Sequence, residues 1–182
     1  MTLTELFARY PTDKDTDHSY GEVYDELFAP LRLDATWVME LGIDKGGSLM
    51  AWRDYFENAE IVGIDADDDR HLDGPRLKTI RSDLRVHHTL VNAVGESGLE
   101  VGTFDLIIDD GPHNLIQQVG CLYVLWEYLK PCGLYIIEDA IQMHEYVAAP
   151  RSVPFQLDAE VIDRRHLKGR SDDILIIFRK GK

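Results

Sequence analysis

The stretch Thr36-Trp-Val-Met-Glu-Leu-Gly-Ile-Asp-Lys-Gly-Gly-Ser48 decides the fold class of this chain. It begins as an apolar run, passes through a glycine loop and continues into a helical pattern over Ser48–Phe56. A second apolar run, Glu60–Asp65, follows that pattern. Continuous rather than alternating apolar runs, separated by helical segments, indicate parallel strands that are covered on both faces. The stretch therefore predicts one strand–loop–helix–strand unit of a doubly wound α/β protein.

The same rhythm continues on both sides of this unit. Further strands are predicted at Leu77–Ser82, Phe104–Asp109 and Leu134–Glu138. Helices are predicted at Leu3–Tyr10, Gly21–Leu31, Leu84–Ala93 and Asn114–Leu129, the last with Asn114 as its N-cap. The tail departs from the rhythm, because Pro154–Ile162 and Asp173–Phe178 predict an antiparallel hairpin at the sheet edge. We expect a mostly parallel, seven-stranded, Rossmann-like sheet.

The composition limits the partners. The 182 residues include 19 basic and 33 acidic side chains, for a net charge of -14. Such a surface repels phosphate backbones and anionic lipids, so we expect no nucleic-acid or membrane partner. The sequence has no leader pattern and no apolar run of membrane-spanning length, which predicts a cytoplasmic protein. Its length predicts one domain over residues 1–182, with residues 1–31 as an N-terminal helical or lid segment.

Carboxylates follow every predicted strand of the parallel region. In chain order they are Glu40, Asp44, Asp65, Asp67, Asp68, Asp69, Asp83, Asp109, Asp110, Glu138 and Asp139. The carboxyl ends of parallel strands meet at one edge of a sheet, where α/β folds bind their ligands. The sequence therefore predicts a strongly acidic binding site at that edge.

The glycine loop argues for a cofactor without phosphate. Asp44 stands where the dinucleotide fingerprint needs its second glycine, and the loop is not a Walker motif. Pyrophosphate also needs bare backbone amides away from negative charge. S-adenosylmethionine carries a sulfonium and an ammonium but no phosphate, so the acidic edge favours it. Gly42 and Gly46 would let the backbone approach this cofactor, and Asp65 would accept both ribose hydroxyls.

A second acidic group lies after the fourth and fifth strands. Asp109-Asp-Gly-Pro-His113 and Glu138-Asp139 bring four carboxylates together, and unneutralised carboxylates would repel one another. A hard divalent cation with oxygen ligands removes that repulsion, and magnesium or calcium suits carboxylates better than zinc. His113 lies three residues beyond Asp110, and histidine is the natural general base at neutral pH.

Five segments occur in an order and at a spacing that are familiar. They are Thr12-Asp-Lys…His18-Ser-Tyr20, Met39-Glu-Leu-Gly-Ile…Gly47-Ser-Leu…Trp52…Tyr55-Phe56, Ile61-Val-Gly-Ile-Asp65, Phe104-Asp-Leu-Ile-Ile-Asp-Asp-Gly-Pro-His113 and Leu129-Lys-Pro-Cys-Gly-Leu-Tyr-Ile-Ile-Glu-Asp139. Together they resemble the metal-dependent sugar O-methyltransferases of macrolide biosynthesis, and the related proteins labelled cephalosporin hydroxylase. The resemblance covers roughly residues 12–140.

This resemblance implies a class I methyltransferase fold. It implies that Asp110, Glu138 and Asp139 hold magnesium, and that His113 takes the proton from a substrate hydroxyl. The residues predicted to bind S-adenosylmethionine are Glu40, Gly42, Gly46, Ser48, Asp65, Ala66, Asp83, Asp109 and Tyr20. The polar segment Thr12–Tyr20 would fold over the cofactor as a lid.

The predicted reaction is direct methyl transfer to a hydroxyl of a small molecule, such as a sugar of a natural product or glycan. The metal would lower the pKa of that hydroxyl, and Asp110 and His113 would be the catalytic residues. His144, just past Glu138 and Asp139, is an alternative base. A homo-oligomer whose neighbouring subunit completes the pocket is a further expectation.

Two other functions remain open at this point. One is a regulatory module that binds S-adenosylmethionine or a nucleotide without chemistry, which His113 and the acidic residues argue against. The other is an NAD-dependent oxidoreductase, which Asp44 and the acidic edge disfavour.

Overall fold

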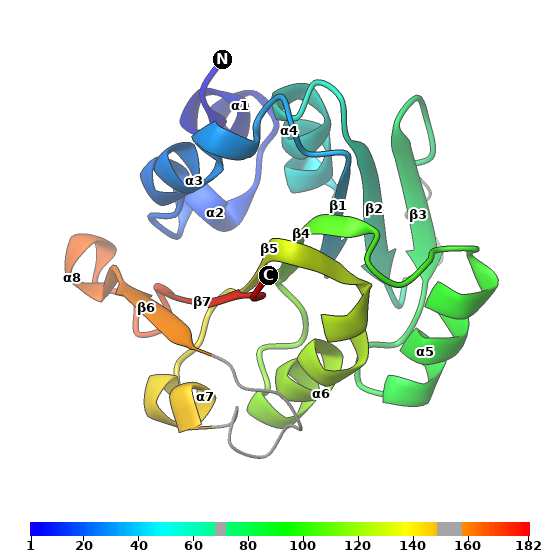
Figure 1. Ribbon diagram of the computed structural model, residues 1–182. Helices are drawn as coiled ribbons and strands as arrows, with labels where there is room; N and C mark the ends of the chain where they lie inside the picture. Colours follow the sequence, from blue (N-terminus) through cyan, green and yellow to red (C-terminus); the bar gives the residue numbers. More distant parts are fainter. Residues whose placement is uncertain (68–71, 149–157) are drawn as a thin grey trace.

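The computed structural model describes residues 1–67, 72–148 and 158–182. Its strands form one sheet in the order β3–β2–β1–β4–β5–β7–β6 (Figure 1). The strands are β1 (Trp37–Leu41), β2 (Glu60–Asp65), β3 (Leu77–Arg81), β4 (Phe104–Asp109), β5 (Leu129–Ile137), β6 (Ala159–Asp163) and β7 (Ile174–Arg179). The order reverses between β1 and β4, which makes that crevice the switch point where doubly wound folds bind ligands.

The pairing directions confirm the predicted fold class. β3, β2, β1, β4 and β5 run parallel to one another, whereas β7 pairs antiparallel with both β5 and β6. The strands predicted at Glu60–Asp65 and Phe104–Asp109 have these bounds in the structure. The predicted tail hairpin is formed by β6 and β7, although residues 154–157 of its first strand lie outside the described residues.

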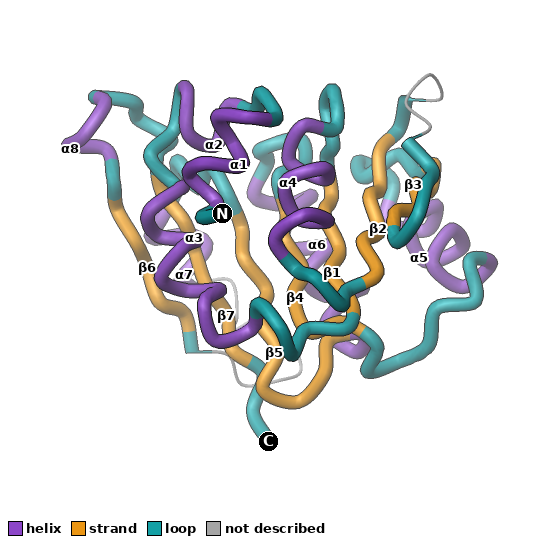
Figure 2. Tube along the Cα trace, turned by 90° about the horizontal axis from the view of Figure 1, so that it is seen from above, coloured by secondary structure: helices purple, strands orange, loops and turns teal. Residues whose placement is uncertain are grey.

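Helices cover both faces of the sheet (Figures 1 and 2). One face carries α1 (Leu3–Arg9), α3 (Gly21–Phe28) and α4 (Gly47–Tyr55). The other carries α5 (His87–Glu96), α6 (Leu115–Leu125) and α7 (Met143–Ala148). The remaining helical turns are α2 (Asp13–Thr16), η1 (Ala29–Leu31), η2 (Trp126–Tyr128) and α8 (Arg165–Lys168).

Three local predictions needed correction. The polar stretch between the first two predicted helices contains the short helix α2, which was not predicted. The helix predicted at Leu84–Ala93 is α5, and it begins at His87 rather than Leu84, because the Thr89 side chain bonds back to the carbonyls of Asp83 and Val86. The sixth helix does not reach Leu129, which already belongs to β5. Asn114 caps α6 as predicted, since its side chain accepts hydrogen bonds from the amides of Ile116 and Gln117.

The strand side chains alternate between two buried clusters. Val38 of β1 packs with the α1, α3 and α4 face, whereas Met39 and Leu41 pack with the α5 and α6 face. Because side chains alternate along a strand, Glu40 points to the same face as Val38. That face carries α2 and α3 as well, so the sheet delivers one buried carboxylate toward the N-terminal helices.

Across the described parts of the chain, no helix combines the length and apolar character that a membrane span requires. The prediction that residues 1–182 form a single domain stays a prediction.

Candidate active site

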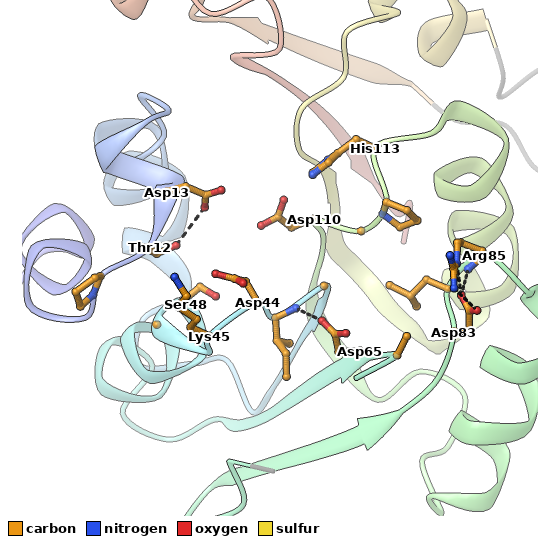
Figure 3. Close-up of a pocket in the computed structure, with 18 residues that line it drawn as sticks. Thr12, Asp13, Asp44, Lys45, Ser48, Asp65, Asp83, Arg85, Asp110 and His113 are labelled. Carbon is orange, nitrogen blue, oxygen red and sulfur yellow. Dashed lines mark hydrogen bonds and ion pairs between the residues drawn. The ribbon is translucent and has the colours of Figure 1, made fainter. Parts of the chain in front are cut away.

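A cavity of about 410 Å³ opens at the carboxyl ends of the parallel strands (Figure 3). It lies between the loops that follow β1, β2 and β4, with the segment before α2 on its other side. Its lining residues are Pro11, Thr12, Asp13, Gly42, Ile43, Asp44, Lys45, Gly47, Ser48, Asp65, Ala66, Asp83, Leu84, Arg85, Asp110, Gly111, Pro112 and His113. The cavity therefore occupies the switch point that the strand order defines.

Gly42 fixes the closest approach between two of these loops. Its φ is +77°, a backbone conformation that side chains disfavour. A Cβ at this position would lie 2.1 Å from the backbone oxygen of Asp110, so no other residue fits without moving the loop after β4. The requirement predicted from the sequence was approach to a ligand. The structure shows a second reason, which is contact between the two halves of the site.

Asp65 and Asp83, the two acids predicted to bind the nucleoside part of the cofactor, have different hydrogen-bond partners in the structure. Asp65 accepts hydrogen bonds from the amides of Ile43 and Asp67, at 2.9 and 3.0 Å, so its carboxylate shapes the loop after β1. Asp83 is held by Arg85 through two bonds of 2.9 and 2.8 Å, and this pairing keeps the pKa of Asp83 low. Both residues line the cavity, but Arg85, which sequence reasoning overlooked, neutralises one of them.

Lys14 of α2 is the central unexpected residue. Its Nζ lies 2.7 Å from Asp110 Oδ2, 2.9 Å from each oxygen of Glu138 and 3.1 Å from Glu40 Oε1. The lysine side chain is 1% exposed. Burial disfavours an ammonium, but the three carboxylates outweigh it and hold the pKa of Lys14 well above its ordinary value. A permanent cation thus lies inside the predicted acidic cluster.

Glu40 and Glu138 are buried acids with partners inside the protein, although Oε1 of Glu40 accepts no hydrogen bond. Glu40 accepts a 2.7 Å hydrogen bond from Ser48 in addition to its ion pair with Lys14. Glu138 also accepts a 2.6 Å bond from the Tyr24 hydroxyl of α3. Burial raises the pKa of both carboxyls, and Lys14 opposes that rise. Neither acid lines the cavity, so each would reach a ligand only through a rearranged contact.

Asp139 is the centre of a second polar group. Its Oδ1 accepts a 2.7 Å bond from the Tyr20 hydroxyl and lies 3.3 Å from His18 Nδ1, and its Oδ2 lies 3.6 Å from His113 Nδ1. His18 and Tyr20 are buried and their rings stack at 4.9 Å. Burial raises the pKa of Asp139, with the neighbouring Asp110 adding to the effect. Tyr20 therefore positions Asp139 and does not line the cavity.

Asp109 lies beneath the cavity floor. Its carboxylate accepts hydrogen bonds from Tyr135, at 2.8 Å, and from the Gly111 amide. It is fully buried, and burial raises its pKa to about 7. These contacts support the Asp110-Gly111 turn, so the predicted direct contact between Asp109 and a cofactor stays a prediction that the geometry does not favour.

Three site residues without glycine's freedom have a left-handed backbone. They are Asp44 with φ 39°, His113 with φ 47° and Asp139 with φ 57°. Aspartate and histidine tolerate this region better than bulky residues do, but it is sparsely populated and strained. In His113 it accompanies a side chain 43% exposed that faces the cavity beside Asp110 (Figure 3).

The structure thus separates the predicted site residues into two sets. Those that line the cavity are Gly42, Ser48, Asp65, Ala66, Asp83, Asp110 and His113. Those that lie behind it are Tyr20, Glu40, Gly46, Asp109, Glu138 and Asp139. The alternative base, His144, is exposed on α7 and is not among the lining residues.

The donor atoms fit a divalent cation. One ligand atom each from Asp110, His113 and Asp139 lie within 4.8 Å of one another, and a hard cation prefers the two carboxylates. Three carboxylates, Glu40, Asp110 and Glu138, contact the ammonium of Lys14, and Asp139 lies next to Asp110. A group with that excess of negative charge accepts further positive charge. Glu138 does not belong to the converging set, because Lys14 takes both of its oxygens.

Comparison with solved structures defines the class of fold. The chain superposes over its whole length on 54% of the MycE methyltransferase of the mycinamycin pathway, solved with Mg, SAH and mycinamycin VI, with a TM-score of 0.79 and 24% identity. It also matches a CmcI structure described as Mg-SAM, with a TM-score of 0.59 and 24% identity over 87% of this chain and 69% of that one. The fold is that of the class I methyltransferases.

Sequence comparison is more specific. The chain is 34% identical to the 8-demethyl-8-alpha-L-rhamnosyl tetracenomycin-C 2'-O-methyltransferase of Streptomyces olivaceus over 145 residues, 75% of this chain and 37% of that protein. It is 33% identical to the demethylmacrocin O-methyltransferase of Streptomyces fradiae over 145 residues, 75% of this chain and 36% of that one. No family model matches. The chain is a homologue of sugar O-methyltransferases of natural-product pathways, and spans just over a third of their length.

Proposed function

We propose that this protein transfers a methyl group from S-adenosylmethionine to a hydroxyl of a sugar carried by a small molecule, with the help of a divalent cation. The observation that carries the proposal is the shared cavity of Gly42, Asp110 and His113, with Asp139 directly behind them. One relative is named as a 2'-O-methyltransferase of a rhamnosyl tetracenomycin, and this name supports a glycosylated acceptor.

The cofactor would lie along the loops after β1 and β2. The cavity wall there offers the backbone of Gly42 and the carboxylate of Asp65, and Asp83 continues it toward α5. A ribose can share Asp65 with the amides of Ile43 and Asp67, because each carboxylate oxygen has two acceptor sites. The sulfonium would then approach Asp110, whose negative charge attracts it.

Asp110 and Asp139 would hold magnesium, with Glu138 as the third predicted ligand once it releases one oxygen from Lys14. When bound, the ion would act as a Lewis acid that lowers the pKa of the substrate hydroxyl. His113 faces the cavity with its ring Nδ1 3.6 Å from Asp139 Oδ2, so this carboxylate lies beside the ring. His113 would accept the hydroxyl proton while the fold keeps oxygen, methyl carbon and sulfur in line.

Two measurements test the proposal. Isothermal titration with S-adenosylhomocysteine and with NAD separates a methyltransferase from an oxidoreductase, and we expect binding of the first alone. Methyl transfer from labelled S-adenosylmethionine to glycosylated natural products, with the matching aglycones as controls, tests the acceptor. Turnover on the glycosides that is lost in EDTA and regained with magnesium supports the proposal. Cofactor binding with no transfer to any glycoside would favour the regulatory module instead.

Further predictions about partners stay predictions. They are the absence of nucleic-acid and membrane partners, the cytoplasmic location and a homo-oligomer that completes the pocket. The acidic charge of -14 supports the first.

A further inference from the structure

We propose that Lys14 is a built-in counter-ion of the metal centre, and that its ammonium weakens divalent-cation binding so that the metal is held loosely and exchangeably. This inference rests on the proposed function, because it concerns the same carboxylates. It adds a role for a residue of the N-terminal segment that the predicted reaction does not use.

The geometry carries the first step. Lys14 Nζ makes hydrogen bonds with Asp110 and with both oxygens of Glu138, and it forms an ion pair with Glu40. All these distances lie between 2.7 and 3.1 Å. An ammonium has three donors, and Asp110 and Glu138 use them all. Such a buried, saturated arrangement is a structural ion cluster and not a side chain that happens to lie near the cavity.

The position of Asp110 carries the second step. This residue belongs both to the Lys14 cluster and to the group of donors that it forms with His113 and Asp139. A cation bound to Asp110 and Asp139 would therefore share a ligand with the ammonium. Two positive charges that share one carboxylate repel each other, and partial burial strengthens the repulsion relative to water.

Glu138 carries the third step. Both of its oxygens contact Lys14, and Tyr24 donates to one of them as well. The lysine thus withholds from the metal the carboxylate that would complete its ligand set. An ion with two protein carboxylates keeps more of its own water and exchanges more readily than an ion in a full cage.

The helix α2 that presents Lys14 is held from outside the cluster. Lys168 Nζ donates to the carbonyls of Asp15 and Thr16, at 2.6 and 3.3 Å, and to that of His18. The counter-ion is therefore fixed at the site by the β6–β7 connection and does not depend on a bound ligand for its position. Because the position of the Lys14 ammonium is fixed, substituting Lys14 removes the charge and tests the inference.

The test is manganese binding to the cofactor-free protein, followed by the electron paramagnetic resonance signal of free Mn²⁺. Lys14→Met removes the ammonium while keeping most of the side-chain volume. We expect this variant to bind Mn²⁺ at least about tenfold more tightly than the wild type, because the repulsion between the ammonium and the metal ion is lost. Lys130→Met is the matched control, because it removes a lysine from an ion pair with Asp105 outside the cavity. We expect it to bind as the wild type does.

Glu40→Gln tests the same inference by removing a negative charge beside Lys14, and the glutamine side chain is nearly isosteric with glutamate. It leaves the ammonium less compensated without removing any residue proposed to bind the metal, so we expect severalfold weaker Mn²⁺ binding. Unchanged or weaker binding in Lys14→Met would overturn the inference, as would unchanged or tighter binding in Glu40→Gln. If Lys14→Met does not fold, Glu40→Gln alone decides.

The outcomes separate this inference from the proposed function. Wild-type binding of Mn²⁺ that Lys14→Met leaves unchanged overturns the counter-ion and leaves the metal role intact. A wild type that binds no Mn²⁺ and methylates in EDTA overturns the metal role. In that case, Mn²⁺ binding that appears only in Lys14→Met supports the counter-ion, and its absence overturns it.

Discussion

Each end of the parallel sheet carries a lysine paired with carboxylates, but the two lysines lie in different surroundings. At the carboxyl end, Lys14 meets Glu40 and Glu138 where both partners are almost completely buried. At the amino end, Lys130 meets Asp105 at 2.8 Å with side chains 30% and 19% exposed. Asp105 also accepts hydrogen bonds from the Thr36 and Trp37 amides, so it ties the start of β1 to β4.

The difference distinguishes an ion pair that stabilises from one that constrains. The amino-end pair keeps water nearby, so its formation requires little desolvation and its contribution is small. The carboxyl-end cluster removes several charges from water, which offsets most of what their attraction contributes. A cluster of that kind is weak support for stability. Four sets of substitutions test the difference between the two ends.

The largest effect is expected from His113, the proposed general base at the carboxyl end. His113→Ala should lower kcat on the true acceptor by about 10²–10⁴-fold, because a positioned base contributes this much. Its affinity for S-adenosylhomocysteine, measured by isothermal titration, should stay close to that of the wild type. His88→Ala removes an exposed histidine of α5 that does not line the cavity, and serves as the control. Near-wild-type turnover in His113→Ala would contradict its role as base.

The second effect compares the two lysines directly. Lys14→Met leaves buried carboxylates without a cation and should lower the free energy of unfolding by about 3–5 kcal/mol in EDTA. Lys130→Met, in the half-exposed pair, should lower it by less than about 1 kcal/mol. Urea unfolding followed by circular dichroism measures both. Adding Glu138→Gln to Lys14→Met should recover part of the loss. Equal losses in the two single variants would remove the contrast between the sheet ends.

The third effect concerns two glycines with the same backbone conformation. Gly42 and Gly98 both have φ +77°, but a Cβ would strike the Asp110 backbone at Gly42 and meet nothing within 4 Å at Gly98. Gly98→Ala should lower the free energy of unfolding by about 1–2 kcal/mol, the conformational term alone. Gly42→Ala should lose more than that and should also weaken binding of S-adenosylhomocysteine. Thermal unfolding and isothermal titration would show this, and similar behaviour of the two variants would count against the close approach.

The smallest effect is a pH dependence at the amino end. Burial alone would raise the pKa of Asp105, but Lys130 and the two amides outweigh it and lower the pKa from 3.8. A carboxyl whose folded-state pKa is lowered adds stability above its unfolded pKa and loses that stability as the pH falls through the folded value. Asp105→Asn should therefore be about 1 kcal/mol less stable than the wild type at pH 7. The gap should close below about pH 4, and a gap that persists at pH 2 would exclude this origin.

The fold was predictable because it depends on patterns that the sequence repeats. Apolar runs such as Phe104–Asp109 are bounded by acids and glycines, so their limits in the structure agree with the prediction. Helix limits were less predictable, because the start of α5 depends on the Thr89 side chain bonding the carbonyls of Asp83 and Val86 in the preceding turn. The short helix α2 carries no apolar period, and its place is set by contacts with Lys168 from the far end of the chain.

The types of residue at the site were predictable from the sequence, but the hydrogen bonds and ion pairs between them were less so. Strand-end acids had to converge, because parallel strands share one edge. Lys14 stood out only as one of several polar residues ahead of the first strand, and nothing local shows that it reaches residues nearly a hundred positions away. A useful signal was the charge imbalance itself, because four converging acids require some internal cation. Tyr24 gave no such signal, since its spacing in α3 is that of a core residue.

The left-handed backbones of Asp44, His113 and Asp139 have a consequence for engineering. Each position adopts a conformation that glycine would adopt with less strain, so Gly replacements there would relax the loops. All three, however, carry side chains at the cavity or directly behind it. Selection for thermostability alone would therefore tend to replace the side chains that line or support the cavity, at the expense of activity.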